Sequence, residues 1–151
     1  MLIDLSLQTS DSRLQTWFMK IHHIGIATTG IDDAAGLWQD LLGLQADHTE
    51  DVPGQKVRVC MLPVGESRLE LLESTAADSP IAKFLEKRGS GIHHIALAVD
   101  DIQSALADLK AKGAKLIDET PRTGASGCLV AFIHPSSTGG VLLELVQEPS
   151  R

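Results

Sequence analysis

The sequence predicts an α+β fold built from two similar halves, each with the element order βαβββ. The segment Ile21-His22-His23-Ile24 recurs as Ile92-His93-His94-Ile95, 71 positions later in a chain of 151 residues. Further matches, at offsets of 71 and 74 positions, pair Ile31 with Ile102, Ala34 with Ala105, and Leu69-Glu70-Leu71 with Leu143-Glu144-Leu145. The repeat therefore extends beyond the histidines and indicates two copies of one structural unit.

The first half begins with an apolar strand at 21–28, followed by apolar positions at helical spacing that end at Gly43. Strands are expected at 44–50 and 56–63, because Val52-Pro53-Gly54 is a turn signal between them. A further apolar segment at 68–72 predicts the last strand of this half.

The second half follows a short helix that Asp78 or Ser79 can cap, with Pro80 in its first turn and Gly89 at its end. It repeats the first half, with a helix that ends at Gly113 and strands expected at 92–99, 114–119, 127–133 and 140–147. The predicted organisation is an N-terminal extension at 1–19 and a single domain at 20–148, whose halves at 20–75 and 91–148 are joined by a linker helix at 78–89.

Composition excludes several classes of protein. The net charge of −7 and the isoelectric point near 5.2 argue against a nucleic-acid partner. No apolar segment approaches the roughly 20 residues that span a bilayer, and residues 1–18 lack the pattern of a signal peptide. Because Cys60 and Cys128 form no C-x-x-C motif, they fit a reducing compartment, so we expect a soluble, cytoplasmic protein without a membrane partner.

Strand alternation separates the members of each histidine pair. The face that carries His93 is bulky beyond it, with Ile95, Leu97 and Val99, as expected of a face packed under a helix. The face that carries His94 is small, with Ala96 and Ala98. The first copy shows the same division. We therefore expect His23 and His94 to face an open cavity, and His22 and His93 to pack or to support them.

Each half also carries a glutamate between leucines on its last strand, Glu70 and Glu144. A buried carboxylate is costly unless it is paired, protonated or bound to a metal. Together with His23 and His94, the two glutamates would suit a borderline divalent ion such as Zn²⁺, Co²⁺, Ni²⁺, Mn²⁺ or Fe²⁺. The alternative is that the histidines are satisfied within the core and the glutamates face solvent.

Such a site would favour proton chemistry next to a carbonyl group, since a metal can stabilise the charge left when an α-proton departs and a nearby glutamate can move the proton. Other polar segments are less informative. His48 and His134 lie in polar or turn-rich contexts and are expected at the surface, and Gly124-Ala125-Ser126-Gly127 is expected to be a flexible loop that could touch a substrate.

Several longer segments resemble a known family. The distinctive ones are His22-His23-Ile24-Gly25-Ile26-Ala27, Asp78-Ser79-Pro80-Ile81-Ala82-Lys83-Phe84-Leu85, Gly91-Ile92-His93-His94-Ile95-Ala96, Phe132-Ile133-His134-Pro135 and Gly140-Val141-Leu142-Leu143-Glu144-Leu145. From about Lys20 to Glu148 the chain resembles the vicinal oxygen chelate, or glyoxalase-like, superfamily, and within it the methylmalonyl-CoA epimerases. The resemblance implies paired βαβββ modules that form a cupped sheet around a metal.

The resemblance also implies metal ligands at His23, Glu70, His94 and Glu144, and a catalytic role for Glu144 with Glu70 as its partner. It implies one divalent ion, Co²⁺ first, an acyl-CoA substrate in propionyl-CoA metabolism, and a homodimer. Two positions depart from part of the family. Some epimerases have glutamine where this chain has Glu70, and some place a catalytic glutamate where this chain has Val59.

Three rival functions follow from the same resemblance. A glyoxalase I, which isomerises a glutathione hemithioacetal, needs similar proton transfer, and Glu70 makes the ligand set look like that of this enzyme. A metal-free binding protein of the bleomycin-resistance type would not need all four ligands. An extradiol dioxygenase would use two histidines and one carboxylate on Fe²⁺, and Glu70 argues against it.

A coenzyme A substrate carries phosphates, whereas the protein is acidic overall. A local group of cations is therefore expected at the mouth of the cavity. The candidates are Lys83, Lys87, Arg88 and Arg122.

Overall fold

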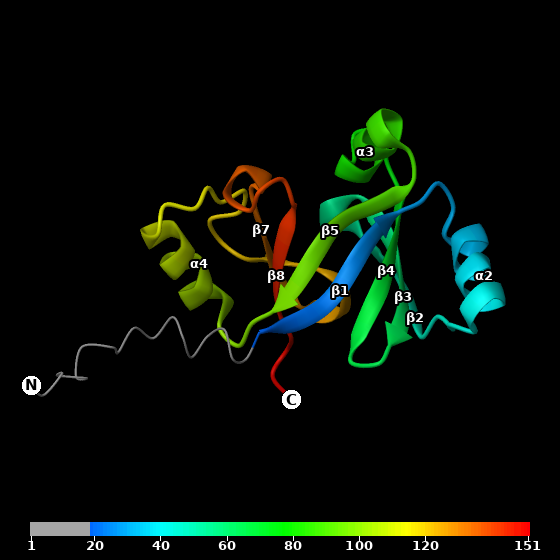
Figure 1. The fold of residues 1–151 in the computed structure, drawn as a ribbon, viewed down its shortest axis with the longest axis horizontal. Coiled ribbons are helices and arrows are strands. Elements are labelled where there is room, and N and C mark those ends of the chain that lie inside the picture. The colour runs from blue at the N-terminus through cyan, green and yellow to red at the C-terminus, as the bar shows by residue number, and fades with distance from the viewer. Residues whose placement is uncertain (1–18) are drawn as a thin grey trace, which may run out of the picture.

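The computed structural model describes residues 19–151, so the N-terminal extension predicted at 1–19 lies, except for Met19, outside the described residues. Within them, eight strands form one sheet in the order β2-β3-β4-β1-β5-β8-β7-β6 (Figure 1). The predicted α+β class and the cupped sheet of two βαβββ modules are confirmed.

The first module contains, in order, β1 (Lys20–Ala27), α2 (Ile31–Leu42), β2 (His48–Val52), the 3₁₀ helix η2 (Pro53–Gln55), β3 (Val57–Val64) and β4 (Ser67–Ser74). Helix α3 (Pro80–Arg88) follows. The second module contains β5 (Gly91–Ala98), α4 (Ile102–Ala111), β6 (Arg122–Thr123), η3 (Ala125–Gly127), β7 (Leu129–Ile133), η4 (Pro135–Ser137) and β8 (Leu143–Gln147).

The centre of the sheet joins the two modules. The first strands of the modules, β1 and β5, pair antiparallel, and each is flanked on its other side by the last strand of its own module in parallel orientation. Figure 1 shows β1 and β5 crossing the middle of the molecule, with α2 and α4 at opposite ends. The four central strands are thus those that carry the repeated histidines and glutamates.

Helices α2 and α4 cover the same kind of sheet surface in each module. Ile31, Ala34 and Trp38 of α2 pack with Ile26 on β1, and the corresponding cluster under α4 includes Leu97 on β5. The prediction that the bulky strand faces lie under helices is therefore confirmed. The opposite sheet face forms the concave interior.

The linker helix α3 starts as its sequence indicates. Ser79 is fully buried, and its hydroxyl accepts a hydrogen bond from the backbone N–H of Ala82 at 3.0 Å, as an N-cap does. Pro80 occupies the first helical turn and Gly89 follows the helix with a positive φ of 71°. Ile81, Phe84 and Leu85 of this helix pack on Ala27, Val59 and Leu72, over the interior face of the first module.

The strand predicted at 114–119 is wrong. This segment forms only an isolated bridge between Leu116 and Ile133, and the short β6 appears later, at Arg122–Thr123. A side chain takes the place of a backbone acceptor here, because the Asp118 carboxylate accepts the Phe132 N–H at 2.9 Å. That donor is then unavailable to a regular strand ladder. The strand expected at 44–50 likewise begins later, at His48.

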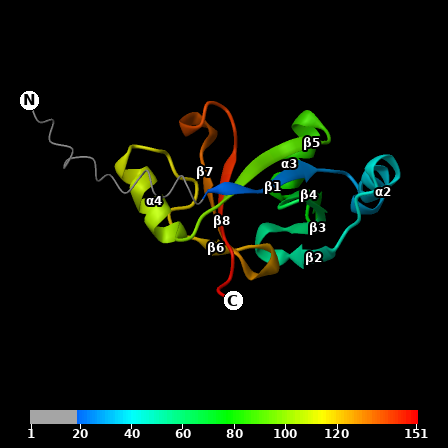
Figure 2. The same ribbon diagram turned by 60° about the horizontal axis from the view of Figure 1, so that its bottom comes forward.

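The sheet curves until its two ends approach each other. The backbone N–H of Ser126 in η3 donates to the carboxylate of Glu50 on β2, which links the second module to the far edge of the first. Figure 2 shows the loop after β6 lying beside β2. In the described part of the chain, no helix is long and apolar enough to cross a bilayer.

Candidate metal centre

Strand register gathers the repeated polar residues into two rows across the concave face. In one row Glu70, Gly25 and His94 lie side by side on β4, β1 and β5. The other row reverses this order, because His23 lies beside Ala96, which lies beside Glu144 on β8. Each row therefore places one small residue between a histidine and a glutamate.

Glycine at position 25 leaves the space that the His94 ring occupies. A Cβ atom added to Gly25 would lie 2.1 Å from Cε1 and 2.4 Å from Nδ1 of His94, closer than nonbonded atoms can approach. The small residues of this face predict an open cavity, but the space beside Gly25 is filled by the His94 ring. The structure shows that Gly25 lets one histidine lean across the neighbouring strand.

The strict alternation expected within the two histidine pairs is interrupted, although His22 and His93 do support their neighbours as expected. The register between β1 and β5 shifts between Ile21 and His23 and again between Gly25 and Ile26, which leaves His22 and His93 as the extra residues of two β-bulges. A bulge redirects a side chain. As a result Nδ1 of His22 lies 2.7 Å from Nδ1 of His23, and the corresponding atoms of His93 and His94 lie 2.9 Å apart.

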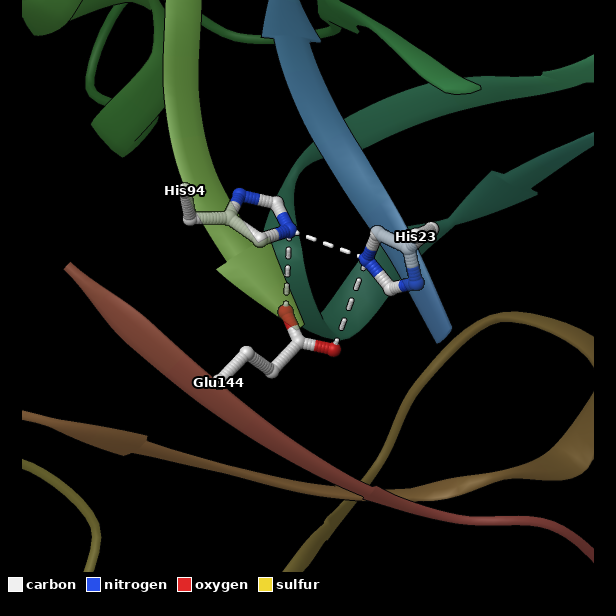
Figure 3. Close-up of side chains that lie close together, drawn as sticks. All are labelled: His23, His94 and Glu144. Carbon is white, nitrogen blue, oxygen red and sulfur yellow. Dashed lines mark hydrogen bonds and ion pairs between the residues drawn. The ribbon is translucent and has the colours of Figure 1, made fainter. Parts of the chain in front are cut away.

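Four predicted site residues converge at the centre. The Nε2 atoms of His23 and His94 are 3.0 Å apart, and Glu144 lies 3.8 Å from the first and 3.2 Å from the second (Figure 3). Glu70 approaches the same nitrogens at 3.6 and 3.8 Å. His23, His94 and Glu144 can each offer one ligand atom within 4.8 Å of the others.

Burial controls the protonation of this cluster. Removal from water lowers the pKa of His23 to about 3, with smaller contributions from His22 and Arg68, and it also lowers the pKa of His94 well below its usual value. Burial, together with the charge of Glu50, raises the pKa of Glu70 to about 8. The pKa of Glu144 is raised by burial and then by Glu70. Burial therefore favours the neutral form of both imidazoles and of both carboxyls.

This donor set fits a divalent cation. Neutral imidazole nitrogens are the form that binds metals, and a nearby cation favours loss of the carboxyl protons. Two nitrogens and two carboxylates match the preferences of borderline first-row ions. All four side chains are almost fully buried, so a bound ion would stand in a site that excludes most water.

One cavity reaches the cluster at His94, and a second borders His22. The larger, of about 320 Å³, is bordered by His93, His94 and Phe132, with Lys56 and Arg122 among its lining residues. The smaller, of about 190 Å³, is bordered by His22, Arg68, Cys128 and Glu148, with Ala125 and Ser126 of the predicted loop.

Of the four cations expected at the cavity mouth, only Arg122 lines the larger cavity. Lys83, Lys87 and Arg88 lie on α3 outside its lining, whereas Lys56, which sequence analysis missed, contributes to it. Lys56 precedes β3 and forms an ion pair with Asp78. Only the curvature of the sheet brings this residue to the cavity, so no local sequence pattern could indicate it.

The two remaining histidines lie apart from the cluster. The side chain of His48 is 45% exposed and contacts Glu50, as expected of a surface residue. His134 accepts the N–H of Ser136 at the start of η4.

The fold and the site define a class of protein. A sequence profile of the Glyoxalase/Bleomycin resistance protein/Dioxygenase superfamily matches residues 22–132, and the chain belongs to this superfamily. The match covers most of both modules, including three of the four residues of the cluster.

The relatives of this chain include methylmalonyl-CoA epimerases and an uncharacterized protein. The chain is 39% identical over 129 residues to the mitochondrial methylmalonyl-CoA epimerase of Homo sapiens, covering 85% of this chain and 73% of that protein. It is 44% identical to an uncharacterized protein of Bacillus subtilis, over 85% of this chain and 91% of the relative. A variant of the Streptomyces coelicolor methylmalonyl-CoA epimerase in complex with 2-nitronate-propionyl-CoA superimposes with a TM-score of 0.84 at 38% identity, covering 87% and 95% of the two chains.

Gly25→Ala should displace the His94 ring and weaken divalent-cation binding by about tenfold or more, the size of effect seen when a metal-bound histidine loses its support. Calorimetric titration of metal-free protein with Co²⁺ measures the change. Gly36→Ala is the matched control, because no atom lies within 4 Å of the position of its added Cβ. Equal Co²⁺ affinity in the two variants would show that the space at Gly25 is not needed.

The buried carboxyls should make the metal-free protein less stable as pH rises from 6.5 to 8. The folded pKa of Glu70, about 8, lies above its ordinary value of 4.5, so the folded state retains a proton that the unfolded state releases, and stability falls with rising pH. The slope is about 1.4 kcal/mol per pH unit for one such carboxyl. The buried histidines act in the opposite direction, but only below about pH 6.5.

Urea unfolding of metal-free protein at several pH values measures this slope. Glu70→Gln should reduce it, and added Co²⁺ should stabilise the wild-type protein more at pH 8 than at pH 6.5. A stability that stays constant between these pH values would contradict the assignment of buried, protonated carboxyls.

Proposed function

We propose that this protein interconverts the (R) and (S) isomers of methylmalonyl-CoA by removing the α-proton and returning it on the opposite face. The observation that carries the proposal is the placement of Glu70 and Glu144. They come from β4 and β8, which flank the central pair of strands on opposite sides. Epimerisation at one carbon needs a proton acceptor and a proton donor on opposite faces, and this arrangement offers one carboxyl from each side.

The proposed metal ligands are His23, Glu70, His94 and Glu144. When bound there, a divalent cation supplies positive charge that stabilises the developing negative charge on the thioester oxygen. Because the four side chains are buried, the cation and the thioester oxygen would interact in a site that excludes most water. Electrostatic stabilisation is stronger there than in water.

In the proposed reaction, the Glu144 carboxylate takes the α-proton of one isomer. The C–H bond breaks, its electron pair spreads over the thioester group, and an O–H bond forms on Glu144. Glu70, loosened from the ion and in its carboxylic acid form, then donates a proton to the opposite face of the same carbon. In the reverse direction the two residues exchange roles. Each module therefore supplies the proton-transferring carboxyl for one face of the α-carbon.

The larger cavity gives this reaction a place for an acyl-CoA. It reaches His94 at the cluster and has both apolar lining, from Leu72, Ile81 and Phe132, and positive charge. Lys56 and Arg122 lie among its lining residues and are suited to phosphate groups. These two cations would let a protein that is acidic overall bind an anionic substrate.

Val59 is buried in the interior between Val57 and Leu72, so it offers no proton acceptor at the position where some epimerases have glutamate. This departure supports the assignment of both proton transfers to Glu144 and Glu70.

Three finer parts of the proposal rest on resemblance to the epimerases. They are Co²⁺ as the ion, a homodimer as the assembly, and a cytoplasmic location in propionyl-CoA metabolism. The free, buried state of both Cys60 and Cys128 is compatible with a reducing compartment. Light scattering in solution and metal analysis of protein purified without added metals test the first two.

Protein reconstituted with Co²⁺ should convert (S)-methylmalonyl-CoA into a mixture of both isomers in D₂O, with deuterium incorporated at the α-carbon. Chiral chromatography and mass spectrometry measure the isomer ratio and the label. The same preparation should not consume the hemithioacetal of methylglyoxal and glutathione. Turnover of the hemithioacetal alone would instead establish a glyoxalase I activity, which the carboxylate at Glu70 favours.

Glu70→Gln should abolish epimerisation while preserving metal binding, because glutamine still offers an oxygen but cannot donate a carboxyl proton. Glu144 should continue to exchange the α-hydrogen of one isomer with solvent. Epimerisation rates, isotope exchange and metal content are measured on the same sample. If the variant keeps its metal and the wild-type rate in both directions, Glu70 does not transfer the proton.

A further inference from the structure

The internal repeat relates the two cavities to each other. Several residues that border the smaller cavity, of about 190 Å³, have counterparts 71 positions away in the lining of the larger one. Three such pairs are His22 with His93, Met61 with Phe132, and Ser126 with Gln55. The smaller cavity therefore occupies the place, relative to the duplicated sheet, that the proposed acyl-CoA cavity occupies on the other side.

One pair of corresponding residues differs in charge. Arg68 lines the smaller cavity, whereas Leu142 lines the larger one. The two positions correspond because Arg68-Leu69-Glu70 matches Leu142-Leu143-Glu144 in the repeat. The smaller cavity thus carries a permanent positive charge at a position where its counterpart is apolar.

The alternation of β4 places Arg68 on the concave face. Leu69 and Leu71 pack under α2 on the other face of the sheet, so Arg68 shares its face with Glu70. In the register of the sheet, Arg68 lies beside His23 on β1. Its side chain therefore borders the smaller cavity next to the candidate metal centre.

Arg68 forms no ion pair with any group in residues 19–151. By contrast, Arg58 on the neighbouring strand pairs with Asp51 at 3.5 Å. Glu148 also lines the smaller cavity, but its carboxylate contacts His22 at 3.3 Å. The guanidinium of Arg68 can therefore offer its donors to an anion that enters this cavity.

We infer that the smaller cavity is a carboxylate subsite, in which Arg68 binds the free carboxylate of the acyl group. The inference rests on the proposed function, because methylmalonyl-CoA carries such a carboxylate on its α-carbon. An anion that leaves water for a buried site needs an opposite charge. A guanidinium suits a carboxylate because its planar donors match the two oxygens.

The acyl group is then held by two of the four substituents of its α-carbon. The thioester leads to the larger cavity, and the carboxylate enters the smaller one. The other two substituents, the hydrogen and the methyl group, are those that change places in epimerisation. The repeat that relates the two cavities also relates Glu70 to Glu144, so one pair of equivalent sites anchors the substrate while the other transfers the proton.

Arg68 thereby makes the site selective for thioesters that carry a carboxylate on the α-carbon. An acyl-CoA without this group cannot form the charge-assisted hydrogen bonds, and it leaves the guanidinium without an anion. The hemithioacetal of methylglyoxal and glutathione also has no carboxylate on its reacting carbon. The subsite therefore favours the epimerase substrate over that of a glyoxalase I.

Malonyl-CoA and acetyl-CoA differ only by this carboxylate, and calorimetric titration of the Co²⁺-loaded protein measures the binding of both. Arg68→Leu copies Leu142 of the larger cavity. It should weaken malonyl-CoA binding about 10- to 100-fold, as expected for the loss of a hydrogen bond between charged groups, and leave acetyl-CoA binding unchanged. Arg58→Leu is the matched control, because Arg58 is an exposed arginine on the neighbouring strand.

Equal affinities of Arg68→Leu and the wild-type protein for malonyl-CoA would overturn the subsite. An equal loss for both thioesters would also overturn it, since that result is expected if Arg68 only balances the charge of Glu148 or supports the fold. If Arg68→Leu does not fold, Arg68→Lys decides, because loss of the planar fork should weaken malonyl-CoA binding alone. A loss that acetyl-CoA shares in this variant overturns the subsite.

Failure of the proposed function has a different signature, because the wild-type protein would then bind neither thioester. Titration with methylmalonate, which has no coenzyme A tail, decides the subsite in that case. Methylmalonate should bind more weakly to Arg68→Leu than to Arg58→Leu. Equal affinities in these two variants, or no binding to the wild-type protein, would overturn the inference.

Discussion

The structure depends on one constraint, which is the placement of two histidines and two glutamates on the concave face of four adjacent strands. Each row of the sheet carries a glutamate, a small residue and a histidine, and the two rows run in opposite directions. Because the rows are related by the internal repeat, the side chains meet between β1 and β5. The small middle residues, Gly25 and Ala96, are as necessary to this meeting as the polar ones.

Burial of such a polar cluster is unfavourable unless every group finds a partner. The histidines satisfy this condition through contacts with one another and with the carboxyls. Within the described residues, no buried side-chain nitrogen or oxygen is left without a hydrogen-bond partner. The apolar clusters under α2 and α4, on the other face of the sheet, supply the hydrophobic burial that offsets the cost.

The two modules are similar in architecture and different in surroundings. On the His22 side, the chain's last strand leads to Glu148 and the smaller cavity. On the His93 side, the larger cavity opens between Lys56, Arg122 and the linker helix α3. The symmetric arrangement of the candidate metal ligands is thus enclosed by an asymmetric shell.

The sequence by itself determined the duplicated βαβββ architecture and the four residues of the candidate site, because repeats and strand periodicity are local properties of the chain. It also indicated the helix-covered face, from the bulky positions around Leu97 and Ile26. Only the tertiary structure decided where His22 and His93 point, since a bulge depends on how two distant strands pair and not on either strand alone. The same reason explains why Lys56 escaped prediction, because its place in the larger cavity arises from curvature that brings remote segments together.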